Sequence, residues 1–201
     1  VLGSLFIPIF ILSLGWFKLL GSYLSFDGEG KYLLGFIGSL VVCPIYASTA
    51  RRLSSRLFIW FSLVSLTISA GFLLKVVGFG IDAFYLGIML YNSGLAIGFH
   101  YMKKRDLFPL FTKELVPFTQ VNLVLSTILL LFFFDDQVFN GFNLLLTACI
   151  YLGMIYVSGK KEYHFVFSIM LVYGVYQILE NWRFEGVNPV GFALIGLLFL
   201  V

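Results

Sequence analysis

Long apolar stretches, separated at near-regular intervals by short polar loops, constrain this chain more than any other feature of its sequence. A membrane-spanning helix needs about 20 mostly apolar residues. The 201 residues are 60% hydrophobic and only 11% charged, whereas soluble domains carry roughly 25% charged residues. The pattern therefore predicts an all-α bundle that uses lipid as its solvent. The eight predicted spans are residues 2–20, 32–50, 57–77, 83–102, 115–134, 142–158, 163–179 and 190–201.

The loops between these stretches alternate in charge, and this alternation predicts how the chain is threaded. The loops of one side hold nine Lys and Arg residues, against four on the other side. Because Lys and Arg concentrate in cytoplasmic loops of membrane proteins, we expect the richer side and the N-terminus to be cytoplasmic. The nine are Arg51, Arg52, Arg56, Lys103, Lys104, Arg105, Lys113, Lys160 and Lys161; the four are Lys18, Lys31, Lys75 and Arg183.

The same asymmetry bears on partners and location. The net charge of +3 lies in the basic loops of one face, so it requires no nucleic-acid partner. We expect the lipid bilayer of a bacterial cytoplasmic membrane as the surroundings. The chain opens at Val1 directly in an apolar stretch, and its last stretch stops after about 12 residues, too short to cross. We therefore expect residues 1–201 to be a single transmembrane domain within a longer protein, whose other helices, or a second copy, are the protein partners.

The basic loops recur about every 53 residues, which is two helices and two turns. This spacing predicts a bundle assembled from helical hairpins. Short likenesses, such as Tyr32-Leu33-Leu34-Gly35 beside Tyr85-Leu86-Gly87, are compatible with an internal duplication and also with the constraints that all membrane helices share. The sequence leaves both explanations open.

Motifs for catalysis or metal binding are missing from the sequence. Cys43 and Cys149 both fall inside predicted spans, and His100 and His164 stand alone near span ends. There is no His-Glu-x-x-His motif, no cysteine cluster, no Gly-rich phosphate loop and no Gly-x-Ser-x-Gly elbow. We therefore expect no enzymatic activity, no cofactor and no metal site.

Small residues mark one face of the predicted span at 83–102. Gly94 and Gly98 form a small-xxx-small pair, and Gly87 lies near the same face. Such faces let helix backbones approach closely in lipid, where no hydrophobic force drives helices together. We expect this face to pack against a neighbouring helix.

Two polar stripes are the candidates for a functional site. Asn122 and Ser126 share one face of the span at 115–134, and Tyr173, Gln177 and Glu180 share one face of the span at 163–179. Polar groups at membrane depth cost free energy unless they face protein or water. We expect the two stripes to meet inside the bundle, with Glu180 at an outward-facing mouth, either as hydrogen bonds that hold helices together or as a solute path.

Four segments carry a resemblance to known proteins: LGSLFIP at 2–8, GEGKYLLG at 28–35, FYLGIMLYN at 84–92 and FTKELVPFTQVNL at 111–123. In these segments the chain resembles large polytopic bacterial integral membrane proteins that are known only as domains of unknown function. The resemblance implies an internal portion of a many-span membrane protein, preceded by a soluble N-terminal region. It implies no catalytic or binding residues.

Two functions of different classes follow from these features. A membrane-embedded scaffold or interaction domain is the leading prediction, and a transporter or channel-like module with a polar path is the alternative; a membrane enzyme ranks third. A transporter should show broken or short helices around a polar site near the membrane midplane. A scaffold should show a closed, dry bundle.

Overall fold

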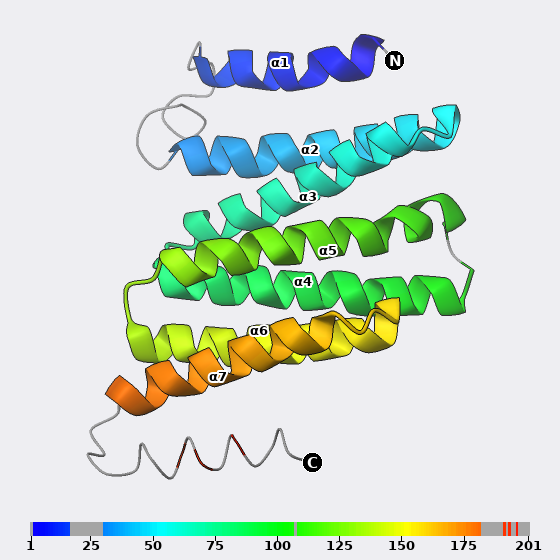
Figure 1. Cartoon of the computed structure of the whole chain (residues 1–201). Helices are drawn as coiled ribbons and strands as arrows, with labels where there is room; N and C mark the ends of the chain where they lie inside the picture. Colours follow the sequence, from blue (N-terminus) through cyan, green and yellow to red (C-terminus); the bar gives the residue numbers. More distant parts are fainter. Residues whose placement is uncertain are drawn as a thin grey trace. The chain divides into compact units, whose positions relative to one another are not determined.

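A computed structural model of the protein describes residues 2–16, 30–106 and 108–181, together with Gly191, Ala193 and Gly196. All the regular structure in these residues is α-helical, as predicted (Figure 1). The predicted span at 190–201 lies almost entirely outside the described residues. The helices are α1 (Leu2–Trp16), α2 (Gly30–Leu53), α3 (Arg56–Val76), α4 (Ile81–Lys104), α5 (Pro109–Phe132), α6 (Gln137–Ser158) and α7 (Tyr163–Asn181).

Five of these helices, α2 to α6, are long and apolar enough to cross a membrane. They have 21 to 24 residues each, which at 1.5 Å per residue matches the hydrocarbon core of about 30 Å. Helix α1 has 15 residues, which is short for a crossing. Helix α7 has 19 residues and is not among the five.

The two ends of helix α6 are set by capping residues. The Asp136 side chain accepts a hydrogen bond from the backbone N–H of Phe139 and caps the N-terminus. At the other end Gly159 adopts the left-handed conformation, with φ of 71°, and its N–H bonds the carbonyl of Ile155. These two residues explain why α6 stops at short polar loops on both sides.

The chain forms two compact units. The first unit comprises Val1–Gly80 and Ile97–Gln120, and the second comprises Ile81–Ala96 and Val121–Val201. Helices α4 and α5 therefore each contribute residues to both units. Each unit is described by itself below.

The first unit is built on the antiparallel hairpin of α2 and α3. Gly35 allows α3 to approach α2, because a Cβ atom at this position would lie 2.5 Å from the Phe72 ring. The Ser62 hydroxyl donates a hydrogen bond across the hairpin to the carbonyl oxygen of Cys43, at 3.0 Å. Small and hydroxyl side chains thus bring these two helices together, as they do in membrane bundles generally.

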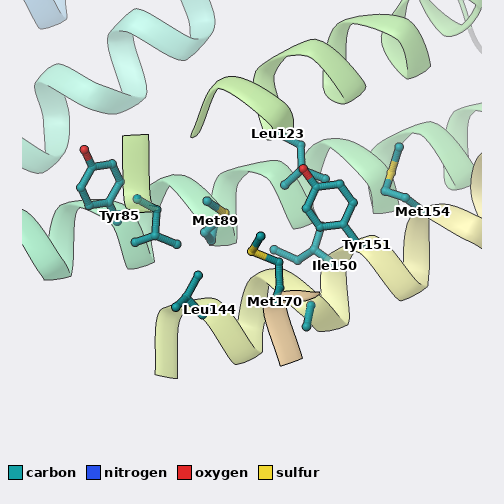
Figure 2. Packing of buried hydrophobic residues seen from close by; sticks show 10 residues of the cluster. Tyr85, Met89, Leu123, Leu144, Ile150, Tyr151, Met154 and Met170 are labelled. Atoms are coloured by element: carbon teal, nitrogen blue, oxygen red, sulfur yellow. The ribbon is translucent and has the colours of Figure 1, made fainter. Parts of the chain in front are cut away.

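The second unit is built on the hairpin of α6 and α7, and its helices touch at two glycines. A Cβ atom on Gly141 would lie 2.8 Å from the carbonyl oxygen of Gly174, and one on Gly174 would lie 2.9 Å from the carbonyl oxygen of Gly141. The two backbones are therefore in direct contact at this crossing. Figure 2 shows the adjoining apolar core, which includes Met89, Leu123, Leu144, Ile150, Tyr151, Met154 and Met170.

The predicted packing face of α4 meets no helix of the described residues at Gly94 or Gly98, so its packing stays a prediction. Gly94 is exposed, Gly87 and Gly98 are half-buried, and a Cβ atom on Gly94 or Gly98 would meet no atom within 4 Å. The reason is helical phase: with 3.6 residues per turn, Gly94 lies on the side of α4 opposite Tyr85, which is buried in the core. Helix α4 packs through the Tyr85 side.

The glycine crossing in the second unit gives a first prediction. Gly141→Ala should lower the thermal unfolding temperature in detergent, because the added methyl group would press on the backbone of α7, and such overpacking costs about 1–3 kcal/mol. Gly94→Ala is the matched control, since it adds the same methyl group to a helix position with open space around it. Equal unfolding temperatures for the two variants would show that the crossing is not tight.

Candidate functional site

Polar side chains from four helices are buried in the second unit. Lipid offers them no hydrogen bonds, so each group needs a protein partner, a bound water molecule or an ion. Their partners therefore decide between a structural and a functional role. The buried polar residues are Asn92 of α4, Ser126 and Thr127 of α5, Asn140, Asn143 and Thr147 of α6, and Gln177 of α7.

Asn92 and Asn122 form an asparagine pair between α4 and α5. The Asn122 amide donates a hydrogen bond of 2.7 Å to the Asn92 side-chain oxygen, and the Asn92 amide donates one of 3.4 Å to the Ser126 hydroxyl. The Ser126 hydroxyl in turn donates to the backbone carbonyl of Asn122 at 2.6 Å. The stripe predicted on this helix is therefore engaged in pairing α5 with α4.

A second polar contact joins α5 to α6. The Thr127 hydroxyl lies 3.2 Å from the Tyr151 hydroxyl and 2.8 Å from the backbone carbonyl of Leu123. A threonine has one hydroxyl proton, and the Leu123 carbonyl takes it, so Tyr151 is the donor in the contact with Thr127. The ring of Tyr151 lies in the apolar core (Figure 2). The bond to Thr127 gives the Tyr151 hydroxyl a hydrogen-bond partner there.

An amide cluster, which we define as Asn140, Asn143 and Gln177, lies between α4, α6 and α7. The Asn140 amide donates a hydrogen bond of 3.0 Å to the side-chain oxygen of Gln177. The Asn143 amide donates one of 2.9 Å to the backbone carbonyl of Asp82, in the first turn of α4. Gln177 therefore faces the bundle, but its hydrogen-bond partner lies on α6 and not on α5.

The remaining residues of the predicted α7 stripe lie nearer the surface. Tyr173 is half-buried, with its ring stacked on Tyr176 at a centroid distance of 6.3 Å, and Glu180 is exposed. Asn122 and Ser126 bond to α4, whereas Gln177 bonds to α6. Asn122 and Ser126 thus belong to one hydrogen-bonded group and Gln177 to another, and the stripes do not meet in these bonds.

Asp82 ties the amide cluster to a loop. Its two carboxylate oxygens accept hydrogen bonds from the backbone N–H groups of Asp135, at 3.1 Å, and Asp136, at 2.9 Å. The carboxylate thus anchors the α5–α6 loop, while the Asp82 carbonyl holds Asn143. This arrangement fixes the start of α4 against the start of α6.

Two oxygens of the amide cluster distinguish it from the asparagine pair. The side-chain oxygens of Asn140 and Asn143 are buried, and no hydrogen-bond donor of the described residues reaches either one. The two residues are three apart on α6, a spacing that puts their Cβ atoms about 5–6 Å apart. Unsatisfied buried acceptors are rare in proteins and call for an explanation. We therefore regard this cluster as the candidate functional site.

These amide oxygens can bind only a few kinds of ligand. Amide oxygens accept hydrogen bonds from water and coordinate hard cations. Among the described residues, no group of three or more His, Cys, Asp or Glu side chains could hold a metal ion. The ligands that the cluster offers are therefore neutral oxygens, which suit water or a monovalent cation.

Sequence reasoning missed Asp82, Asn92, Asn140 and Asn143. A signal for α6 was present, because Asn140, Asn143 and Thr147 follow one another at helical spacing on one face. For Asn92 the signal was weaker, since a single amide in an apolar helix sets no periodicity. A general rule would have found all three asparagines: an amide at membrane depth needs a partner.

Comparisons with known proteins add no assignment. No protein-family model matches the chain, and no curated protein or solved structure matches it either. The expected membership in a group of large bacterial membrane proteins therefore stays a prediction.

The asparagine pair gives a second prediction, tested by a double-mutant cycle. Asn92→Leu and Asn122→Leu, alone and together, should show a coupling free energy of about 0.6 kcal/mol, up to about 1.7 kcal/mol, as found for hydrogen bonds between membrane helices. Unfolding in mixed micelles provides the measurement.

Asn92→Leu with Thr147→Val is the control cycle, because the Thr147 hydroxyl bonds the Asn143 carbonyl of its own helix. The effects of these two changes on the free energy of unfolding should add within about 0.5 kcal/mol. If the coupling free energy of the asparagine pair is no larger than that of the control, the bond between Asn92 and Asn122 does not stabilise the bundle.

Proposed function

We propose that the protein is a multi-pass protein of a bacterial cytoplasmic membrane, with eight spans and a cytoplasmic N-terminus. The proposal rests on which side chains are exposed and which are buried. Ile97, Phe132 and Phe165 are 70%, 74% and 72% exposed, whereas Asn92 and Asn140 are fully buried. An apolar outer surface around polar buried groups is stable in lipid and unstable in water. The five long apolar helices support the same conclusion.

Within that membrane we propose that the domain acts as a scaffold or interaction domain. The polar groups of α4 and α5 and the Thr127–Tyr151 contact bond to one another across helices, so they hold the bundle closed. The outer face of α4 offers a surface for a partner, because Gly94 is exposed with open space around it. Small residues on such a face favour close helix association. The partner is a helix of a longer chain or of a second copy.

Threading supplies the third prediction. In a background without Cys43 and Cys149, single cysteines at Ser54, Asp106 or Lys160 should resist an impermeant thiol reagent in intact cells, because their loops carry the excess of Lys and Arg. A cysteine at Gln137 should be labelled. Permeabilised cells serve as the control, since all four positions should then react. Labelling of the first three in intact cells would reverse the proposed orientation.

The scaffold role supplies the fourth prediction. Gly94→Leu should reduce the fraction of chains cross-linked to a second copy in membranes, because the larger side chain holds the partner helix away. The unfolding temperature should stay unchanged, since the position is open within the chain. Gly153→Leu is the matched control, because Gly153 of α6 is also exposed with no atom near its Cβ position. Equal cross-linking of both variants would count against α4 as the interaction surface.

A transporter or channel-like module is the second candidate. One observation favours it: the buried side-chain oxygens of Asn140 and Asn143 accept no hydrogen bond from the described residues and could coordinate a monovalent cation. Asp82, Asp135 and Asp136 add negative charge at this end of α6. Sodium or potassium flux through proteoliposomes of the unaltered protein, abolished by Asn143→Leu, would favour transport over the scaffold.

A further inference from the structure

A pocket lies in the first unit, where α4 ends and α5 begins. Its volume is about 360 Å³, and its walls include Phe99, Met102 and Lys103 of α4 and Thr112 and Lys113 of α5. The two lysines come from different helices and meet at one cavity. Phe99 and Met102 give the same cavity an apolar wall.

The surroundings of the pocket are strongly basic. Lys104 and Arg105 follow Lys103 directly, and the Arg105 guanidinium stacks on the Tyr101 ring at 4.6 Å. The Arg51 guanidinium, at the end of α2, stacks on the Phe108 ring at 4.3 Å. A residue far away in the sequence thus adds its positive charge beside the turn between α4 and α5.

The acidic residues nearby neutralise little of this charge. Glu114 is buried, and its two oxygens are taken by the Arg56 Nε and by the Trp60 indole N–H, each at 3.1 Å. Asp106 lines the pocket as its one carboxylate. Lys103 and Lys113 are both exposed, and the Lys103 ammonium lies 5.7 Å from the Phe99 ring centroid, at the apolar wall.

We propose that this pocket binds the headgroup of an anionic phospholipid. The lysines from the two helices contact the phosphate group, and Phe99 and Met102 contact the glycerol and the first carbons of the acyl chains. Basic pockets between membrane helices at the headgroup level have this chemistry. A free phosphate ion would use only the lysines and leave the apolar wall in water. The inference rests on the membrane insertion proposed above but not on the scaffold role.

The test uses the purified full chain in a neutral detergent, titrated with phosphatidylglycerol. Phosphatidylcholine and inorganic phosphate are the comparison probes, and the readouts are the unfolding temperature and lipid retention in native mass spectrometry. Phosphatidylglycerol should raise the unfolding temperature and remain bound, whereas the two other probes should do neither. Equal stabilisation by inorganic phosphate would make this a free-anion site, and equal retention of phosphatidylcholine would overturn the headgroup selectivity.

Charge-removing variants test whether the lipid binds in this pocket. Lys103→Gln with Lys113→Gln should weaken the apparent affinity for phosphatidylglycerol about 30-fold, because each lysine near an anionic lipid contributes about a fivefold factor. Lys160→Gln with Lys161→Gln removes the same charge from a basic loop of the second unit and should change the affinity little. An equal loss of affinity for phosphatidylglycerol in both double variants would show nonspecific charge attraction and overturn the assignment of the lipid to this pocket.

Two further measurements separate the possible failures. Lys103→Arg with Lys113→Arg keeps the charge and should retain the lipid, and it supplies a folded comparison if the Gln variant unfolds. Extraction of membranes at alkaline pH tests insertion independently. A chain that resists extraction but shows no preference for phosphatidylglycerol would overturn the lipid site and leave the membrane proposal standing.

Discussion

The structure depends on one constraint: polar groups inside a lipid-solvated bundle must find their partners within the protein. Lipid gives no hydrogen bonds, and it provides no hydrophobic force that would press helices together. Two kinds of contact remain, and both occur in the second unit. Gly141 and Gly174 bring α6 and α7 into backbone contact, while Asn92 and Asn122 join α4 to α5 through side-chain amides.

The same constraint explains the surroundings of Glu114, a buried carboxylate among the described residues of the first unit. Glu114 is only 8% exposed, and leaving its charge unpaired would cost several kcal/mol. Arg56 provides the opposite charge and Trp60 provides an N–H donor, so both oxygens are satisfied. Trp60 also packs edge-on against Phe118 at 5.6 Å. A basic residue and an indole from α3 thereby fix the first turns of α5.

Sequence reasoning predicted what depends on local composition and missed what depends on neighbours. The length and apolarity of each stretch predict the helices, since a span must match the bilayer. Helical spacing also indicated correctly that Ser126 and Gln177 face the interior. Spacing does not identify the neighbouring helix, so the expected contact between Gln177 and the α5 stripe did not follow; α6 supplies the partner instead. For the same reason, spacing alone does not identify the helix that Gly94 would face, because a small face fits any close helix, inside or outside the chain.

The asparagine pair and the amide cluster differ in how completely their buried polar atoms are hydrogen-bonded. Asn92 uses both its amide and its oxygen within the protein, so these bonds hold α4 against α5. Asn143 must point its amide at the Asp82 carbonyl, because turning the group over would set two oxygens against each other. Its own oxygen is therefore fixed in the interior, and no donor of the described residues reaches it. Asn140 has more freedom, since it and Gln177 are both amides and can exchange the roles of donor and acceptor. In the arrangement described, the side-chain oxygens of Asn140 and Asn143 are the acceptors that the cluster offers to water or a cation.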